Sequence, residues 1–218
     1  AMRDLITPQI EKIRVDTPAA CSEIARFVDD FIPEFRSKLE LYAGERPIFD
    51  LYGIDEEINK ALGRQVKLKS GGDLIIDQTE ALTTVDVNTG GFVGLRNFDD
   101  TIFKTNLEAV TAIARQLRLR NLGGIIIIDF IDMVLESNRE QVLRRLVECL
   151  GRDRTKHQVA EVTSLGLVQM TRKRVGQGLI EAFSNVCESC HGRGIHVSLE
   201  PIDRSTHRPS SEGGFSHS

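Results

Sequence analysis

Asp86, Asn88 and Asp129 are the side chains in this sequence best suited to binding a hard metal ion. Asp86 and Asn88 lie near the end of the alternating stretch EALTTVDVN, residues 80–88, and Asp129 ends the apolar run IIIID, residues 125–129. In open α/β sheets ligands gather at the carboxyl ends of strands, so the two carboxylates could share a Mg²⁺, with Asn88 orienting a ligand. Two aspartates that simply begin turns would fit the same pattern.

A second candidate metal site is formed by Cys187 and Cys190 in the stretch NVCESCHGRGI, residues 185–195. The C-x-x-C spacing lets two thiolates bind one ion from a tight turn, but a structural zinc needs four ligands, so only half of such a site is visible. The same residues read C-x-x-C-H, the attachment pattern of a c-type haem with His191 as the axial ligand. A turn that carries two free thiols is the third possibility.

Two short basic stretches, RQLRLR and TRKR, are candidates for binding phosphates. The net charge of −4 for the whole chain argues neither for nor against a nucleic-acid partner. Taken alone, either stretch is better explained as the solvated face of a helix or strand. The candidate phosphate-binding residues are Arg115, Arg118, Arg172, Lys173 and Arg174.

Length and composition limit the class of protein. A chain of 218 residues with 40% hydrophobic residues has enough apolar surface for one large domain or two small ones. No apolar run approaches the roughly 20 residues that cross a bilayer, and the N-terminus lacks the pattern of a signal peptide, so we expect a cytoplasmic protein. A reducing compartment disfavours disulfides, and haem attachment normally needs export, so zinc is favoured at the C-x-x-C motif.

The N-terminal part of the chain reads as helical. A Thr-Pro pair followed by an amphipathic run predicts a helix over residues 18–32, and a second helical stretch is expected to reach about Leu41. The turn AGERP, residues 43–47, is the best candidate for a domain boundary. Beyond it, two alternating runs around Gly71 and Gly72 predict a β-hairpin.

The elements that must position the aspartates follow the hairpin. Alternation places Val85 and Val87 on the strand face opposite Asp86, and the apolar run before Asp129 is expected to be a strand covered on both faces. Amphipathic helices are predicted from about Asp99 and from about Ser137, with two shorter strands after them. This order predicts an α/β fold, with a mixed sheet and covering helices.

Several segments together resemble the ribonuclease E/G family. They are VDVNTG at 85–90, NLEAVTAIARQLRLRNLGGIIIIDFIDM at 106–133, SLGLVQMTRKR at 164–174 and C-x-x-C-x-GRG at 187–194. The resemblance implies a DNase I-like catalytic subdomain followed by a zinc-link. The implied organisation is a helical segment at 1–46 that resembles the end of an RNase H-like subdomain, the DNase I-like subdomain at 47–185, the zinc-link at 186–198 and a disordered tail at 199–218.

The resemblance also implies an activity and residue roles. Members of this family are Mg²⁺-dependent endoribonucleases that cut single-stranded RNA in RNA processing and decay, leaving 5′-phosphate and 3′-hydroxyl ends. The family's metal-binding aspartates fall on Asp86 and Asp129, and its supporting asparagine falls on Asn88. Its shared zinc would take Cys187 and Cys190 from each of two chains. The implied assembly is a homodimer, which in a full-length parent could pair into a tetramer.

Two alternatives belong to other classes of protein. A non-catalytic module for RNA binding and zinc-mediated dimerisation would keep the cysteines and basic residues but would need no Mg²⁺, and an electron carrier would need haem. The sequence has no segment resembling the RNA-binding and 5′-sensor subdomains that precede this region in the family. We therefore expect a fragment that holds the catalytic subdomain.

Overall fold

The computed structural model describes residues 9–90, 98–163, 165–192 and 194. The chain divides into two units, Ala1–Ala182 and Phe183–Ser218. The predicted tail at 199–218 lies outside the described residues, and the predicted boundaries at 46 and 185 stay predictions.

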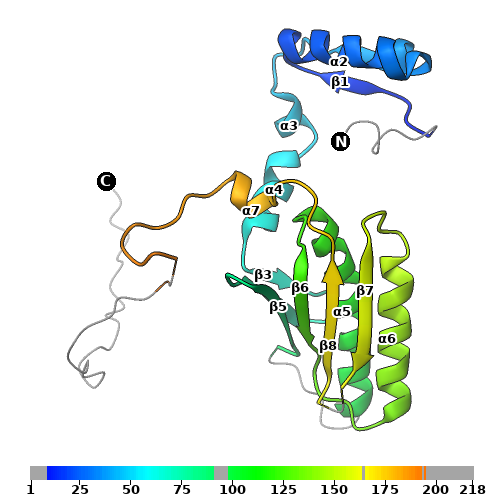
Figure 1. The fold of residues 1–218 in the computed structure, drawn as a ribbon, viewed down its shortest axis with the longest axis vertical. Helices are drawn as coiled ribbons and strands as arrows, with labels where there is room; N and C mark the ends of the chain where they lie inside the picture. Colours follow the sequence, from blue (N-terminus) through cyan, green and yellow to red (C-terminus); the bar gives the residue numbers. More distant parts are fainter. Residues whose placement is uncertain (1–8, 91–97, 164, 193, 195–218) are drawn as a thin grey trace, which may run out of the picture. The chain divides into compact units, whose positions relative to one another are not determined.

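A six-stranded sheet forms the centre of the first unit, with the strand order β3-β4-β5-β6-β8-β7 (Figure 1). The central pair β5 and β6 is parallel, and every other neighbouring pair is antiparallel. The mixed sheet that the sequence predicts is therefore confirmed. The strands are β3 (Gln65–Lys67), β4 (Asp73–Gln78), β5 (Leu82–Asn88), β6 (Gly124–Asp129), β7 (His157–Val162) and β8 (Leu167–Arg172).

Two helices, α5 (Phe98–Leu119) and α6 (Glu136–Leu150), pack on one face of this sheet (Figure 1). Apolar residues at three- and four-residue steps form the buried stripe of each helix. On α5 the stripe includes Val110 and Leu117, and on α6 it includes Val142, Leu146 and Leu150. The core therefore lies between the helices and one face of the sheet, as the periodicity predicts.

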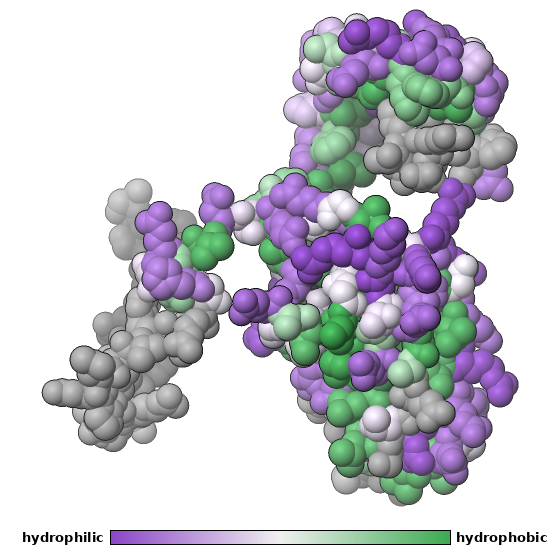
Figure 2. All heavy atoms as spheres, viewed as in Figure 1, coloured by the Kyte–Doolittle hydropathy of each residue, from purple (hydrophilic) through white to green (hydrophobic). Residues whose placement is uncertain are grey.

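The other face of β6 corrects one prediction. Ile126 and Ile128 are fully buried against the helices, but Ile125 is 42% exposed and Ile127 is only partly buried. The strand is thus covered on one face rather than on both. Figure 2 looks onto the strands and shows hydrophobic and hydrophilic side chains mixed on this side of the sheet. A continuous apolar run shows that both faces avoid polar groups, but it does not show that a helix covers each of them.

The N-terminal elements confirm one prediction and correct another. Helix α2 (Pro18–Phe31) begins after Thr17, as the Thr-Pro pair predicts. The expected second helix is only a short 3₁₀ helix, η1 (Pro33–Lys38), and it leads into strand β2 (Leu39–Leu41). Strand β2 pairs in parallel with β1 (Ile13–Val15), more than twenty residues away in sequence, and local patterns cannot report such a pairing.

The hairpin and the short helices complete the first unit. β3 and β4 are joined by a turn in which the Leu68 amide donates to the Gly72 carbonyl at 2.8 Å, and Gly71 has a φ of 96°. This confirms the predicted hairpin. The short helices are α3 (Ile48–Leu51), α4 (Ile54–Leu62) and α7 (Leu179–Ala182). None of the described helices is both long enough and apolar enough to cross a membrane.

Candidate active site

The parallel pairing of β5 and β6 brings Asp86 and Asp129 together. The two residues are register partners at the carboxyl ends of their strands. Neighbouring strands lie about 4.8 Å apart, and side chains of register partners point to the same face. Both aspartates are exposed, while Val85 and Val87 are buried on the opposite face of β5. The structure thus places two carboxylates side by side on the open face of the sheet.

Asn88 extends this pair by two residues along β5. Its Nδ2 donates a hydrogen bond to Asp86 Oδ2 at 3.0 Å. The amide therefore restrains the Asp86 carboxylate and leaves the other carboxylate oxygen free of this bond. The predicted trio of Asp86, Asn88 and Asp129 is one cluster in space.

The electrostatics of the cluster favour a cation. Partial burial raises the pKa of Asp129, and the negative charges of Asp86 and Asp132 raise it further. Asp132, in the loop after β6, is thus close enough to act on the same site. Three carboxylates that repel one another lower their energy when a divalent cation binds among them.

The donor set fits a magnesium ion better than a fully enclosed metal site. No group of three or more His, Cys, Asp and Glu side chains in the described parts of the chain is arranged to hold a metal. Mg²⁺ commonly takes one or two carboxylates and fills its remaining positions with water and substrate phosphate. Asp86 and Asp129 offer such a pair.

Asn106 on α5 fixes the loop that follows Asp129. Its side chain is fully buried; Nδ2 donates to the Ile131 carbonyl at 2.8 Å, and Oδ1 accepts from the Ile131 amide at 3.1 Å. A buried amide that satisfies both backbone groups of one residue holds that residue firmly. Sequence reasoning missed this residue, although a lone asparagine on the apolar stripe of a helix is the signal that could have found it.

Two glycines let the β3–β4 turn approach the end of β5 closely. A Cβ atom on Gly72 would lie 2.4 Å from the Asn88 carbonyl oxygen, and one on Gly90 would lie 2.3 Å from the Gly71 carbonyl oxygen. Gly90 also has a φ of 69°, a conformation that favours glycine. The glycine-rich loop after Asn88 therefore has a packing role at residue 90, and its continuation at 91–94 lies outside the described residues.

The predicted phosphate-binding residues lie at the other end of the sheet. β8 is antiparallel to β6, so Arg172 pairs with Gly124 while Leu167 pairs with Asp129. Five residue steps of about 3.3 Å separate the two ends of β6, roughly 17 Å. Lys173 and Arg174 follow Arg172 at the far end, and Arg118 lies in the last turn of α5. The structure does not bring these residues together with the aspartates.

The exposed members of this set are only partly neutralised. Arg115 pairs with Glu57 at 3.2 Å, and Arg174 pairs with Glu181 at 3.4 Å. In these pairs the side chains are about half exposed or more, so solvent weakens the attraction and leaves the arginines able to meet a phosphate.

Arg172 differs from its neighbours because its side chain is only 3% exposed. Its Nε donates to Asp153 Oδ2 at 2.7 Å, and Nη1 donates to the Leu122 carbonyl at 2.7 Å. Nη2 donates to Asp153 Oδ1 at 3.3 Å and to Thr155 Oγ1 at 3.2 Å. This guanidinium holds the protein interior together, so the assignment of Arg172 to RNA binding is replaced by a structural role.

Cys187 and Cys190 lie in the second unit, within a tight turn. The His191 amide donates to the Cys187 carbonyl at 2.8 Å, and the Gly194 amide donates to Cys190 Sγ at 3.2 Å. His191 has a φ of 49°, which helps the chain to turn sharply. Within the described residues these thiols have no further Cys, His, Asp or Glu beside them that would complete a metal site.

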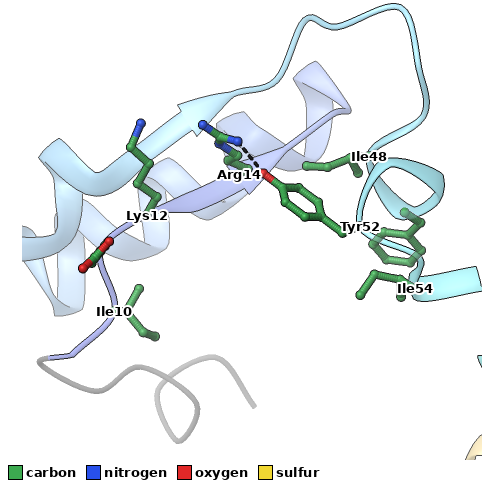
Figure 3. A pocket seen from close by; sticks show the side chains of 8 residues that line it. Ile10, Lys12, Arg14, Ile48, Tyr52 and Ile54 are labelled. Atoms are coloured by element: carbon green, nitrogen blue, oxygen red, sulfur yellow. Dashed lines mark hydrogen bonds between the residues drawn. The ribbon is translucent and has the colours of Figure 1, made fainter. Parts of the chain in front are cut away.

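A cavity of about 690 Å³ lies beside β1 and α3, and none of the predicted site residues lines it (Figure 3). Ile48, Tyr52 and Ile54 form part of its apolar wall. The Tyr52 hydroxyl accepts a hydrogen bond from Arg14, which also pairs with Glu40. The charge of Arg14 is therefore already balanced within the chain.

Comparison with known proteins identifies the family. The model of the ribonuclease E/G family matches residues 1–175. Ribonuclease G of Salmonella typhimurium (strain SL1344) is 55% identical over 201 residues, covering 92% of this chain and 41% of that protein. Ribonuclease E of Escherichia coli (strain K12) is 42% identical over 207 residues, covering 94% of this chain and 19% of that protein. The chain thus spans about two fifths of the length of the ribonuclease G relative, and it belongs to the ribonuclease E/G family.

Proposed function

We propose that this chain carries the catalytic centre of a Mg²⁺-dependent endoribonuclease that cleaves single-stranded RNA in RNA processing and decay. The observation that carries the proposal is the juxtaposition of Asp86 and Asp129 on adjacent parallel strands. Their place at the carboxyl ends of strands, the raised pKa of Asp129 and the family membership all support it.

Each residue of the cluster has a distinct task in this proposal. Asp86 and Asp129 would hold the metal ion, which would supply positive charge for the scissile phosphate and a more acidic water for hydrolysis to 5′-phosphate and 3′-hydroxyl ends. Asn88 restrains the Asp86 carboxylate through its 3.0 Å hydrogen bond. Asn106 anchors Ile131, which lies between Asp129 and Asp132 in the chain, and so limits the movement of both aspartates.

RNA would be held partly at a distance from the aspartates. Arg115, Arg118, Lys173 and Arg174 lie at the far end of the sheet and suit phosphates that flank the cleaved bond. Because these contacts are exposed and electrostatic, affinity should fall steeply with salt.

We also propose that the two thiols of each chain share one zinc with the thiols of a second chain. Cys187 and Cys190 are thiols that could supply two ligands, and a tetrahedral structural site needs four. A homodimer satisfies this requirement, and a longer protein could pair two such dimers into a tetramer.

The test compares RNA cleavage by the parent with cleavage by Asp86→Asn and Asp129→Asn variants. Each variant should lose Mg²⁺-dependent cleavage by orders of magnitude and keep most of its RNA affinity, because a metal ligand is lost while phosphate contacts remain. Asp77→Asn is the matched control, since Asp77 lies on the same sheet face but pairs with Arg64 at 2.6 Å. Full cleavage by either site variant would refute the assignment. RNA binding by a parent that never cleaves would instead favour the non-catalytic module.

A further inference from the structure

A small groove lies between α5 and α6, on the side of the helices away from the sheet's open face. Its volume is about 290 Å³. Thr111 and Cys149 lie 3.9 Å apart between their Oγ1 and Sγ atoms in its wall. The charged residues that line it are Arg118 from α5, and Arg145, Glu148 and Arg152 from α6 and the residues just after it.

The charges around this groove do not balance. Arg145 pairs with Glu148 at 3.3 Å. Arg118 and Arg152 have no hydrogen-bond or ion-pair partner among the described residues, 9–90, 98–163, 165–192 and 194. Three guanidinium groups therefore face one carboxylate. A concave site lined by an excess of one charge attracts the opposite charge.

The fold explains why the arginines converge. α5 connects the parallel strands β5 and β6, and α6 connects β6 to β7, which runs in the same direction because both are antiparallel to β8. The two helices thus run alongside each other in one direction and end at the same end of the sheet (Figure 1). Arg118 lies in the last turn of α5, and Arg152 follows the last residue of α6 by two.

We propose that the groove between α5 and α6 is a binding site for a backbone phosphate of RNA, remote from the aspartates. The proposal rests on the proposed function, because it assigns a second contact to the same substrate. Guanidinium groups bind phosphate through two parallel N–H donors, and Arg118 and Arg152 are both available for such contacts. A groove of this size admits a phosphate with its ribose but is small for a larger ligand.

A purely structural role predicts different behaviour. Cationic side chains at helix C-termini also stabilise the helix through its dipole. An arginine that served only the helix would change stability on substitution and leave RNA affinity unchanged.

The first experiment measures the affinity of single-stranded RNA against salt for an Arg118→Gln, Arg152→Gln double variant, without Mg²⁺. Loss of two phosphate contacts should raise the dissociation constant several-fold and reduce the slope of log K against log salt by about 1.4, at roughly 0.7 per contact. Arg144→Gln is the control, because Arg144 is exposed on α6 but does not line the groove. An unchanged slope in the double variant overturns the proposal, even where stability falls.

The second experiment uses Cys149 in the groove wall as a reporter. Bound RNA should slow alkylation of Cys149 several-fold in the parent, much less in the double variant, with partly buried Cys21 as the internal reference. Equal protection by inorganic phosphate alone would show a small-anion site and overturn the RNA assignment, as would no protection by RNA. Repeating the measurement in the Asp129→Asn variant keeps the result separate from the catalytic proposal, because the alkylation rate of Cys149 can be measured without RNA cleavage.

Discussion

The buried ion pair between Arg172 and Asp153 allows the sharpest prediction. Their side chains are 3% and 4% exposed. Replacing Arg172 by Met keeps most of the apolar stem but leaves the Asp153 carboxylate buried without its partner. It also removes the hydrogen bonds that Arg172 donates to Thr155 Oγ1 and to the Leu122 carbonyl. Breaking a buried pair from one side typically costs about 3–5 kcal/mol. For a chain of this size the melting temperature should fall by roughly 6–20 °C.

The pH dependence of stability gives a second test of the Arg172→Met substitution. Burial would raise the pKa of Asp153, but hydrogen bonds from Arg172 and Thr155 outweigh it and hold the pKa below its ordinary value. In the parent, this contribution to stability is present above pH about 4 and is lost as the pH falls through the folded-state pKa. Without Arg172 the hydrogen bonds from Thr155 remain, but burial is the larger influence on the pKa of Asp153, so this pKa should rise and favour the protonated carboxyl group. The stability difference between parent and variant should therefore shrink in acid.

Thermal unfolding of the parent, Arg172→Met and the exposed-neighbour control Lys173→Met measures these effects. Lys173→Met should change stability by less than about 0.5 kcal/mol, as surface substitutions usually do. If Arg172→Met kept the parent's stability and instead weakened RNA binding with a smaller salt dependence, the reasoning would be refuted and Arg172 would return to the RNA-binding set.

Three further predictions concern the active site and the cysteine turn. Asn106→Leu leaves the Ile131 amide and carbonyl unpaired, so the free energy of unfolding should fall by about 2–4 kcal/mol and RNA cleavage should fall with it. Normal stability together with normal cleavage would contradict the anchoring role of Asn106. Because the pKa of Asp129 is raised in the folded chain, the stability of the parent declines as the pH rises through that pKa. Without Mg²⁺, the Asp129→Asn variant should therefore be at least as stable as the parent at neutral pH and should lose any such advantage in acid. A variant less stable than the parent at neutral pH would contradict this prediction. Metal analysis should give one zinc per two chains, and Cys187→Ser should lose both zinc and dimer; one zinc per chain would rule out sharing.

Local periodicity in the sequence determined much of the fold. The alternation in residues 80–88 placed Val85 and Val87 inside and Asp86 outside, as the structure shows. Helical spacing predicted α2, α5 and α6, and glycines marked the hairpin turn. These features could be predicted because they depend on residues a few positions apart, whose geometry is nearly the same in any fold.

Tertiary structure decided what those faces meet. The partnership of Asp86 with Asp129 requires strands 43 positions apart in sequence to become parallel neighbours. Spacing alone also could not show that Ile125 faces outward or that Leu39–Leu41 forms a strand paired with β1. It could not show either that Arg172 points inward while Lys173 stays exposed. A periodic pattern shows which side of an element a residue occupies, but burial and pairing depend on which distant element packs on that side, and only the whole folded chain determines this.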